Sequence, residues 1–314
     1  MSKATNCSVS VIIPCYNAEN WIEKALESVN NQVLKPLEVV VVDDGSTDNT
    51  LKVIESYNSI VPIITVTQLN SGPSVARNLG VTKASGQYIA FLDADDEWCE
   101  NKLLVQMPMV NTRSFSSSNS LLIDQDNIVI EEHKNICPQN RIESIEAIYL
   151  GKISMLTPGL VIPKNSFIEV GGFNTKLRYK EDHSLVISLL CSGLELKYIE
   201  KPLFKVRVHE SSGRNNVDEK VLIKSFMLFS DISIKQHSAL EKLKSNFISK
   251  MYYILMKSFL GRKPFKACKY AFISFISKPS IVGISLLFIS LIPINKNQAV
   301  KYKKNIIRFF SRKG

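Results

Sequence analysis

The chain has 314 residues, of which 45% are hydrophobic and 22% charged, so it can bury a sizeable core and is not an intrinsically disordered protein. Its net charge of +10 is uneven, because residues 1–215 hold 20 Lys and Arg against 25 Asp and Glu, whereas residues 216–314 hold 19 against 4. We expect a folded core followed by a basic region that suits an anionic surface, either nucleic acid or the inner leaflet of a membrane. The six cysteines show no C-x-x-C spacing, and we expect them to be reduced thiols of a cytosolic protein.

The first hundred residues alternate strand and helix patterns with short connections. Apolar runs predict strands at 9–14, 37–42, 63–67 and 87–92, and helical spacing predicts helices at 20–31, 46–57 and 74–84. Ser46, Thr47 and Asp48 supply the N-cap chemistry for the second of these helices. This order predicts an α/β fold with a mostly parallel central sheet, right-handed crossovers and helices on both faces.

The pattern is weaker from about residue 98 to residue 153. It includes a serine-rich stretch at 114–120 and scattered short strands, and residues 114–140 are too irregular to read. A second ordered block at 155–208 contains a helical pattern at 181–192 and a strand at 198–208. Beyond Arg214 the sequence becomes helical and basic.

The C-terminal residues predict contact with a membrane surface. The uncharged stretch 281–294 is shorter than the roughly 20 residues that span a bilayer. The basic segment 301–310 follows, with apolar and aromatic residues between its charges. Together they favour an interfacial anchor, and the alternative is a buried helical hairpin followed by a disordered basic tail.

The tetrapeptide Asp93-Ala94-Asp95-Asp96 directly follows the fourth predicted strand. Clustered carboxylates beside a core strand repel one another unless a cation neutralises them. Oxygen ligands suit Mg²⁺ or Mn²⁺, particularly an ion that carries a diphosphate. The alternative interpretation is a solvated acidic turn.

Polar loops also follow the other three strands, at residues 14–17, 43–48 and 70–74. Each has an ordinary explanation, because Asp44 and Ser46 can be turn or cap residues, and Arg77 can be solvated on its helix. Adjacent parallel strands, however, bring their carboxyl-end loops together around one ligand site. No G-x-G-x-x-G or P-loop lysine motif occurs, which disfavours dinucleotide-binding and kinase-type proteins.

Four segments in succession resemble the signatures of family 2 glycosyltransferases: VSVIIPCYN at 9–17, VDDGSTD at 42–48, GPSVARNLG at 72–80 and FLDADD at 91–96. The resemblance covers residues 8–215 and implies an inverting enzyme of the GT-A fold with a nucleotide-sugar donor. It divides the chain into a catalytic domain at 1–215, with a nucleotide-binding half at 1–97 and an acceptor half at 98–215. A helical, basic, membrane-associating region at 216–314 follows.

The resemblance implies donor-site roles for the strand-end loops. Asp44 would contact the base, and Pro14 and Tyr16 would line its pocket. Asp93 and Asp95 would form the D-x-D motif, with Asp95 as the ligand of Mn²⁺ or Mg²⁺. The remaining expected nucleotide contacts are Asn17, Ser46, Gly72 and Arg77.

The second block resembles the acceptor side of the same family. Gly171 and Gly172 match its glycine loop beside the acceptor and donor sugar. Glu181-Asp182 matches its E-D pair, in which the aspartate is the catalytic base. A carboxylate there can take the proton of an attacking hydroxyl. Without the family, a carboxylate favoured by the helix dipole would be the simpler explanation for Asp182.

The segment from Arg207 to Ser212 resembles the part of the family that closes the site. Strand alternation places Arg207 and His209 on the same side. We expect Arg207 at the diphosphate and His209 at the metal.

These inferences predict the transfer of one sugar per acceptor, because the Q-x-x-R-W signature of processive synthases and channel-forming helices are absent from the sequence. We expect a UDP-sugar donor and a glycan acceptor, lipid-linked, in surface polysaccharide synthesis. The enzyme would be cytoplasmic and peripheral on the inner face of the membrane. One alternative is a sugar nucleotidyltransferase, which would need a glycine- and lysine-rich loop after the first strand. Another is a protein that binds nucleic acid through the basic tail. The carboxylates of the core would repel the phosphates of the nucleic acid.

Overall fold

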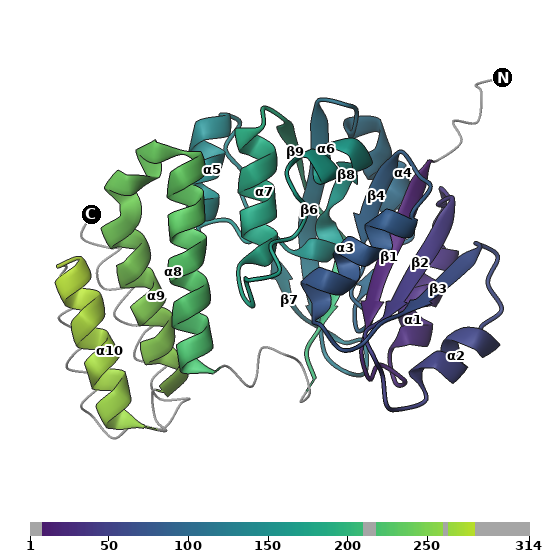
Figure 1. The fold of residues 1–314 in the computed structure, drawn as a ribbon, viewed down its shortest axis with the longest axis horizontal. Helices are drawn as coiled ribbons and strands as arrows, with labels where there is room; N and C mark the ends of the chain where they lie inside the picture. The colour runs from purple at the N-terminus through teal and green to yellow at the C-terminus, as the bar shows by residue number, and fades with distance from the viewer. Residues whose placement is uncertain (1–7, 210–217, 260–262, 280–314) are drawn as a thin grey trace.

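The computed structural model describes residues 8–209, 218–259 and 263–279. Within these ranges lies a nine-stranded sheet in the order β3-β2-β1-β4-β8-β6-β9-β5, with β7 paired to β6. Helices cover both faces of this sheet, and the helices of residues 219–277 stand beside it (Figure 1). The predicted α/β class with a mostly parallel central sheet is confirmed.

The N-terminal half is the doubly covered parallel sheet that the sequence predicts. Its strands are β1 (Val9–Cys15), β2 (Glu38–Asp43), β3 (Ile63–Thr67) and β4 (Tyr88–Phe91). Its helices are α1 (Ile22–Asn30), α2 (Thr50–Ser56) and α3 (Pro73–Lys83). Alternate residues of β1 and β2 enter two core clusters, one with α1 and α2 and the other with α3. All four strands run parallel, so their carboxyl ends share one edge of the sheet.

The second half extends the sheet with mixed pairing. β8 (Val161–Pro163) is antiparallel to β4 and β6 (Ser114–Ile123), and β9 (Glu195–Arg207) is parallel to β6. Two short strands lie at the periphery. β5 (Glu97–Trp98) pairs antiparallel with β9, and β7 (Val129–His133) pairs antiparallel with β6. The helices are α4 (Lys102–Gln106), α5 (Arg141–Tyr149), α6 (Lys164–Glu169) and α7 (Glu181–Cys191), with short 3-10 turns at Met107–Met109 and Thr157–Gly159.

The serine-rich stretch corrects the sequence prediction. It was too irregular to assign, yet it forms most of β6, a ten-residue strand in the middle of the sheet. Its polar side chains are buried because they find partners inside the protein. Gln106 donates to the hydroxyl of Ser116 at 3.1 Å, and Asn119 donates to the carbonyl of Glu200 at 2.6 Å. Hydropathy periodicity cannot show a strand whose burial depends on such distant partners.

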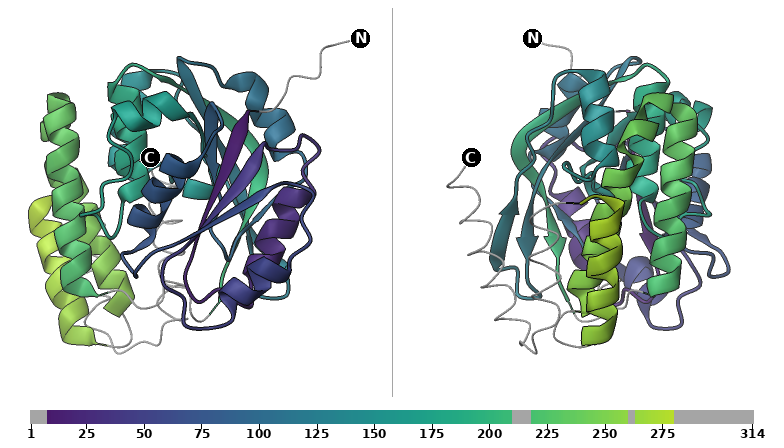
Figure 2. Two further views of the ribbon diagram at one scale, coloured as in Figure 1. Left: turned by 45° about the vertical axis from the view of Figure 1, so that its right-hand side comes forward. Right: turned by 90° about the vertical axis from the view of Figure 1, so that its left-hand side faces the viewer.

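The described helices of the basic C-terminal region pack directly on the core. α8 (Glu219–Gln236), a 3-10 turn at Ser238–Leu243, α9 (Lys244–Phe259) and α10 (Pro264–Ser277) stand side by side along one edge of the molecule (Figure 2). Tyr149 of α5 stacks on Phe247 with ring centroids 4.8 Å apart, and its hydroxyl lies 2.7 Å from that of Ser230. Each buried aromatic side chain contributes about 1.5–3 kcal/mol, so α8 and α9 are part of the folded unit.

Among the described helices, none combines the length and the apolar character that a membrane span requires. The stretch 281–294 and the basic segment 301–310, on which the predicted anchor rests, lie outside the described residues, as does the predicted domain boundary at 215. The five described cysteines are unpaired.

Candidate active site

The loops after β1 and β2 are hydrogen-bonded to each other. The backbone N–H of Asn17 donates to the hydroxyl of Ser46 at 3.0 Å, and the N–H of Thr47 donates to Oδ1 of Asn17 at 2.8 Å. Asn17 has a φ of 51°, which asparagine tolerates better than most residues. Tyr16 is exposed beside them, after Pro14 at the buried end of β1. The structure therefore brings together four of the residues predicted for the nucleotide pocket.

Asp44 joins the end of β2 to the loop before α3. Its Oδ1 accepts from Gln68 Nε2 at 2.7 Å and from the N–H of Ser71 at 2.8 Å, and its Oδ2 accepts from the N–H of Gly72 at 2.7 Å. Gly72 has a φ of 92°, which only glycine adopts readily. A carboxylate offers about four acceptor positions, so Oδ2 keeps one for a ligand. The base contact of Asp44 remains a prediction.

The helix after β2 begins later than predicted. α2 starts at Thr50, with Asn49 in the cap position, one residue after the predicted cap segment 46–48. Asp48 nevertheless caps the helix start as predicted, because its Oδ1 accepts a hydrogen bond from the N–H of Thr50 at 3.0 Å. Ser46 is thereby free to hold the β1 loop instead.

Arg77 connects the acidic loop to the start of α7. Its Nη2 lies 2.5 Å from Oδ1 of Asp93, and its Nη1 lies 3.8 Å from Oε1 of Glu181. The residue is only 5% exposed, and its guanidinium lies 5.2 Å from the ring centre of Phe173. Nε and Nη1 have no hydrogen-bond partner among the described residues. The alternative of a solvated helix residue is therefore wrong, and Arg77 is a buried cation between two carboxylates.

Glu181 and Asp182 occupy the first turn of α7 with different ionisation. Burial and the charge of Asp182 raise the pKa of Glu181 to about 7, against the opposing effect of Arg77. Burial also raises the pKa of Asp182, but His183 and Lys180 outweigh it, so the pKa lies below its usual value. Burial and Lys180 lower the pKa of His183, against the opposing effect of Asp182.

Only one of the two carboxylate oxygens of Asp182 is hydrogen-bonded to described residues. Its Oδ1 accepts from the N–H of His183 at 2.7 Å and lies 2.6 Å from Nδ1 of the same residue. Oδ2 has no partner among the described residues. An ionised carboxylate with one oriented and one available oxygen is suited to accept a proton from a hydroxyl.

His209 and Asp95 meet at the other end of the acidic loop. Nε2 of His209 lies 3.0 Å from Oδ2 of Asp95. The indole of Trp21 packs against both His209, at 5.1 Å, and Arg207, at 5.0 Å. The prediction that Arg207 and His209 share one side is therefore confirmed.

The guanidinium of Arg207 is used inside the protein. It pairs with Glu97, and it donates to the carbonyls of Asp95 at 3.1 Å and Asp124 at 3.0 Å. The backbone N–H of Arg207 donates to Oδ1 of Asp96 at 2.9 Å. Arg207 thus shapes the acidic loop, and a contact with a diphosphate, which stays a prediction, would require it to leave these partners.

The donor set around Asp95 fits a divalent cation held jointly with a substrate. A carboxylate oxygen and an imidazole nitrogen suit Mn²⁺, and both Mn²⁺ and Mg²⁺ commonly take their remaining ligands from phosphates and water. Within the described ranges no group of three or more His, Cys, Asp or Glu could hold a metal alone. Asp95 and His209 would hold the ion, and a donor diphosphate would have to complete its coordination.

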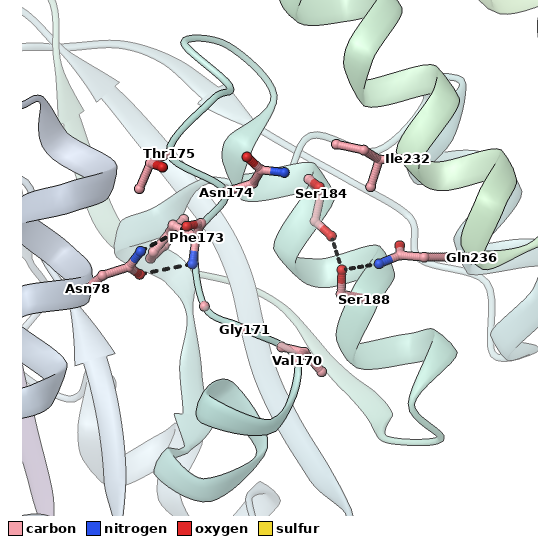
Figure 3. Close-up of a pocket in the computed structure, with 11 residues that line it drawn as sticks. Asn78, Val170, Gly171, Phe173, Asn174, Thr175, Ser184, Ser188, Ile232 and Gln236 are labelled. Atoms are coloured by element: carbon pink, nitrogen blue, oxygen red, sulfur yellow. Dashed lines mark hydrogen bonds between the residues drawn. The ribbon is translucent and has the colours of Figure 1, made fainter.

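The glycine loop lines a cavity of about 350 Å³ between α3, α7 and α8 (Figure 3). Asn78 braces this loop, because its Nδ2 donates to the carbonyl of Phe173 at 2.8 Å and its Oδ1 accepts from the N–H of Phe173 at 2.9 Å. A methyl group on Gly172 would lie 2.7 Å from Oδ1 of Asn78, so glycine is needed there. Gly171 and Gly172 line this cavity, whereas Asp182 does not.

Three residues of the site escaped the sequence prediction: Trp21, Glu97 and Lys180. Trp21 lies within the predicted helix 20–31, where it contributes to the pattern only as an apolar residue. Glu97 directly follows the acidic tetrapeptide, and this position in the sequence could have indicated that it belongs to the site. Lys180 precedes Glu181 and is held over the ring of Phe226 at 5.7 Å, a contact that no local pattern could show.

Residues 10–168 match the sequence profile described as "Glycosyl transferase family 2". The chain belongs to this family of glycosyltransferases. It is 33% identical over 212 residues to the putative teichuronic acid biosynthesis glycosyltransferase TuaG of Bacillus subtilis, covering 66% of this chain and 82% of TuaG. It is 32% identical over 262 residues to WfgD of Escherichia coli, a UDP-Glc:alpha-D-GlcNAc-diphosphoundecaprenol beta-1,3-glucosyltransferase, covering 81% of this chain and 94% of WfgD.

Other relatives are longer than this glycosyltransferase. It spans only 29% and 34% of two uncharacterized glycosyltransferases of Rickettsia bellii and Rickettsia felis, to which it is 36% identical. The crystal structure of S. aureus TarS 1–349 has a TM-score of 0.62 at 16% identity and covers 95% of this chain and 91% of that one. This likeness supports the GT-A fold, and membership of the family excludes the nucleotidyltransferase alternative.

Proposed function

We propose that this glycosyltransferase is a metal-dependent inverting enzyme that moves one sugar from a UDP-sugar to a hydroxyl of a lipid-linked glycan in surface polysaccharide synthesis. The activity of WfgD, with a UDP-glucose donor and a GlcNAc-diphosphoundecaprenol acceptor, supports this choice. So do the putative role of TuaG in teichuronic acid biosynthesis and the S. aureus TarS complexes with UDP and UDP-GlcNAc.

The bridge formed by Arg77 carries the proposal. One guanidinium contacts both Asp93 of the D-x-D motif and Glu181, the neighbour of Asp182. A donor diphosphate at the acidic loop and a base at the start of α7 would therefore stand within one side chain of each other. That spacing suits a sugar held between a leaving group and a base.

In this mechanism Asp182 Oδ2 accepts the proton of the acceptor hydroxyl as the hydroxyl oxygen attacks the anomeric carbon. The lowered pKa keeps Asp182 ionised at neutral pH, and the bonds from His183 hold its orientation. Because the base and the leaving diphosphate lie on opposite faces of the donor sugar, a single displacement inverts the anomeric centre. When bound, Mn²⁺ or Mg²⁺ would neutralise the charge that develops on the departing diphosphate. Asp93, held by Arg77, would orient the nucleotide.

A donor screen tests this proposal. UDP-, GDP- and CDP-sugars are added to the protein with Mn²⁺, and the thermal unfolding temperature is measured. We expect stabilisation by UDP-sugars only, lost on adding a chelator. Equal stabilisation by all three nucleotide classes would contradict the UDP assignment, and stabilisation that survives chelation would contradict the metal.

The membrane part of the proposal rests on the outer surface of the C-terminal helices. Phe265, Phe272 and Ile276 recur at helical spacing on α10, and Phe265 is 91% exposed. Exposed lysines flank them, as in helices that lie on anionic lipid surfaces. Flotation with phosphatidylglycerol-containing vesicles should retain the wild-type chain and release a variant in which Phe265, Phe272 and Ile276 are all replaced by glutamate; equal retention of both would contradict membrane contact through this surface.

A further inference from the structure

Three lysines gather around Gly151, at the end of α7 that carries Asp182. Nζ of Lys250, from α9, donates to the carbonyl of Gly151 at 2.6 Å. A methyl group on Gly151 would lie 3.5 Å from Nζ of Lys250 and 3.7 Å from Nζ of Lys180. Since both distances start from one point, the two nitrogens lie no more than about 7 Å apart, a separation that one phosphate can bridge through two of its oxygens. Lys152 is the next residue in the chain, and we call Lys152, Lys180 and Lys250 the lysine cluster.

Two of the three lysines in the lysine cluster, Lys152 and Lys250, have no carboxylate partner among the described residues. Burial and the charge of Lys152 lower the pKa of Lys250, with no carboxylate acting in the opposite direction. Burial lowers the pKa of Lys180 to about 8, and Lys250 adds to this effect against the attraction of Asp182 and Glu181. Neither Lys152 nor Lys250 forms an ion pair within the described parts of the chain. Like charges held together in this way favour an anionic ligand.

The backbone at the lysine cluster also favours an anion. Lys180 has a φ of 70°, a left-handed conformation that costs a non-glycine residue of order 1–3 kcal/mol. This conformation places Lys180 at the N-cap of α7, an eleven-residue helix. The positive end of the helix dipole therefore adds to the charge of the side chains. Two residues further along the chain is Asp182.

We propose that the lysine cluster binds a phosphate or diphosphate group carried by the acceptor sugar. The inference rests on the proposed role of Asp182 as the base that receives the acceptor hydroxyl. A sugar phosphorylated at its anomeric carbon would present a ring hydroxyl to Asp182 and place its phosphate one ring width away, beside Lys180. Asp93 and Asp95, assigned to the donor diphosphate, lie across the Arg77 bridge from this position. The acceptor class is therefore a glycosyl phosphate or diphosphate.

Binding of two matched sugars tests the proposal. The full chain is saturated with UDP and Mn²⁺ so that the donor site is occupied. N-acetylglucosamine 1-phosphate and methyl N-acetylglucosaminide are then titrated by calorimetry. We expect the phosphorylated sugar to bind at least tenfold more tightly, and Lys250→Gln to remove about tenfold of its affinity, the factor for one lost charge-assisted contact.

Lys224→Gln is the matched control. Lys224 is an exposed lysine of α8, two positions from Phe226 and hence on the opposite side of the helix from the ring that underlies Lys180. It removes the same charge and should leave both affinities unchanged. Lys152→Gln provides a second exposed variant of the cluster, which should follow Lys250→Gln.

Two results would overturn the inference: equal affinity for the two sugars, or equal effects of Lys250→Gln and Lys224→Gln. A methyl glucuronide that binds through Lys250 as tightly as the phosphorylated sugar would replace phosphate by carboxylate as the ligand. The affinity for UDP is measured first. Its absence would contradict the proposed donor, while the comparison of sugars and variants would still decide the role of the lysine cluster.

Discussion

The two sides of the candidate active site differ in how their charges are satisfied. On the donor side, Asp44 already accepts three hydrogen bonds and Arg207 is enclosed by carbonyls and Glu97. On the proposed acceptor side, Asp182 keeps one oxygen available, and Lys152 and Lys250 have no ion-pair partner among the described residues. The donor side is thus preorganised by its own contacts, whereas the acceptor side is completed by helices from the C-terminal region. A donor shared by many enzymes suits the first arrangement, and a specific acceptor suits the second.

The strongest test of this division is Asp182→Asn. It should reduce kcat for sugar transfer by about 10²–10⁴, the contribution of a positioned proton acceptor, because it removes the base and keeps the shape. The affinity for UDP with Mn²⁺ should not change. Turnover is followed by UDP release with an acceptor. Retained turnover would exclude Asp182 as the base, and a parallel loss of UDP binding would show that the two sides are not separable.

Arg77→Gln should break the link between the two sides. It leaves Asp93 and Glu181 near each other without their buried cation, and we expect a loss of about 3 kcal/mol in the free energy of unfolding. Urea unfolding monitored by tryptophan fluorescence measures it. Arg77→Lys, which keeps the charge, should lose less. A loss below 1 kcal/mol for Arg77→Gln, as for a surface ion pair, would contradict the bridge.

Glu181 predicts a pH dependence of stability. Its pKa rises from 4.5 to about 7 on folding, so between these values the folded protein retains a proton that the unfolded chain releases. Stability from this group is complete below pH 4.5 and is lost as the pH rises through 7. Relative to Glu181→Gln, the wild type should lose about 2 kcal/mol between pH 5 and pH 7.5. Urea titrations at both pH values measure the difference, and a constant difference would mean that Glu181 is ionised throughout.

Asp95→Ala should have the smallest effect, confined to the donor side. Loss of one metal ligand should weaken Mn²⁺-dependent UDP binding about tenfold. Asp126→Ala, an exposed carboxylate in the turn before β7, is the control and should leave the affinity unchanged. Calorimetry with UDP, with and without Mn²⁺, separates the two. Equal affinities for Asp95→Ala and the wild type would remove Asp95 from the metal site.

Local patterns predicted the donor half well because it is built from local rules. The continuous apolar runs predicted β3 with its observed bounds. They predicted the ends of β1, β2 and β4 to within a residue or two. Their loops then had to meet at one edge of the sheet. The sequence pattern did not predict the serine-rich strand β6. Its polar residues are buried against β9 and α4, which are separate segments of the chain.

The sequence by itself determined the α/β order, the strand-end loops and the motif positions of Asp93, Asp95, Glu181 and Asp182, because these follow from residue spacing. Only the tertiary structure decided which charges meet. The bridge through Arg77, the pair of Glu97 with Arg207 and the meeting of Lys180 with Lys250 join segments far apart in sequence. Coulomb interactions and desolvation depend on distance in space and on burial, and neither quantity is encoded in local periodicity.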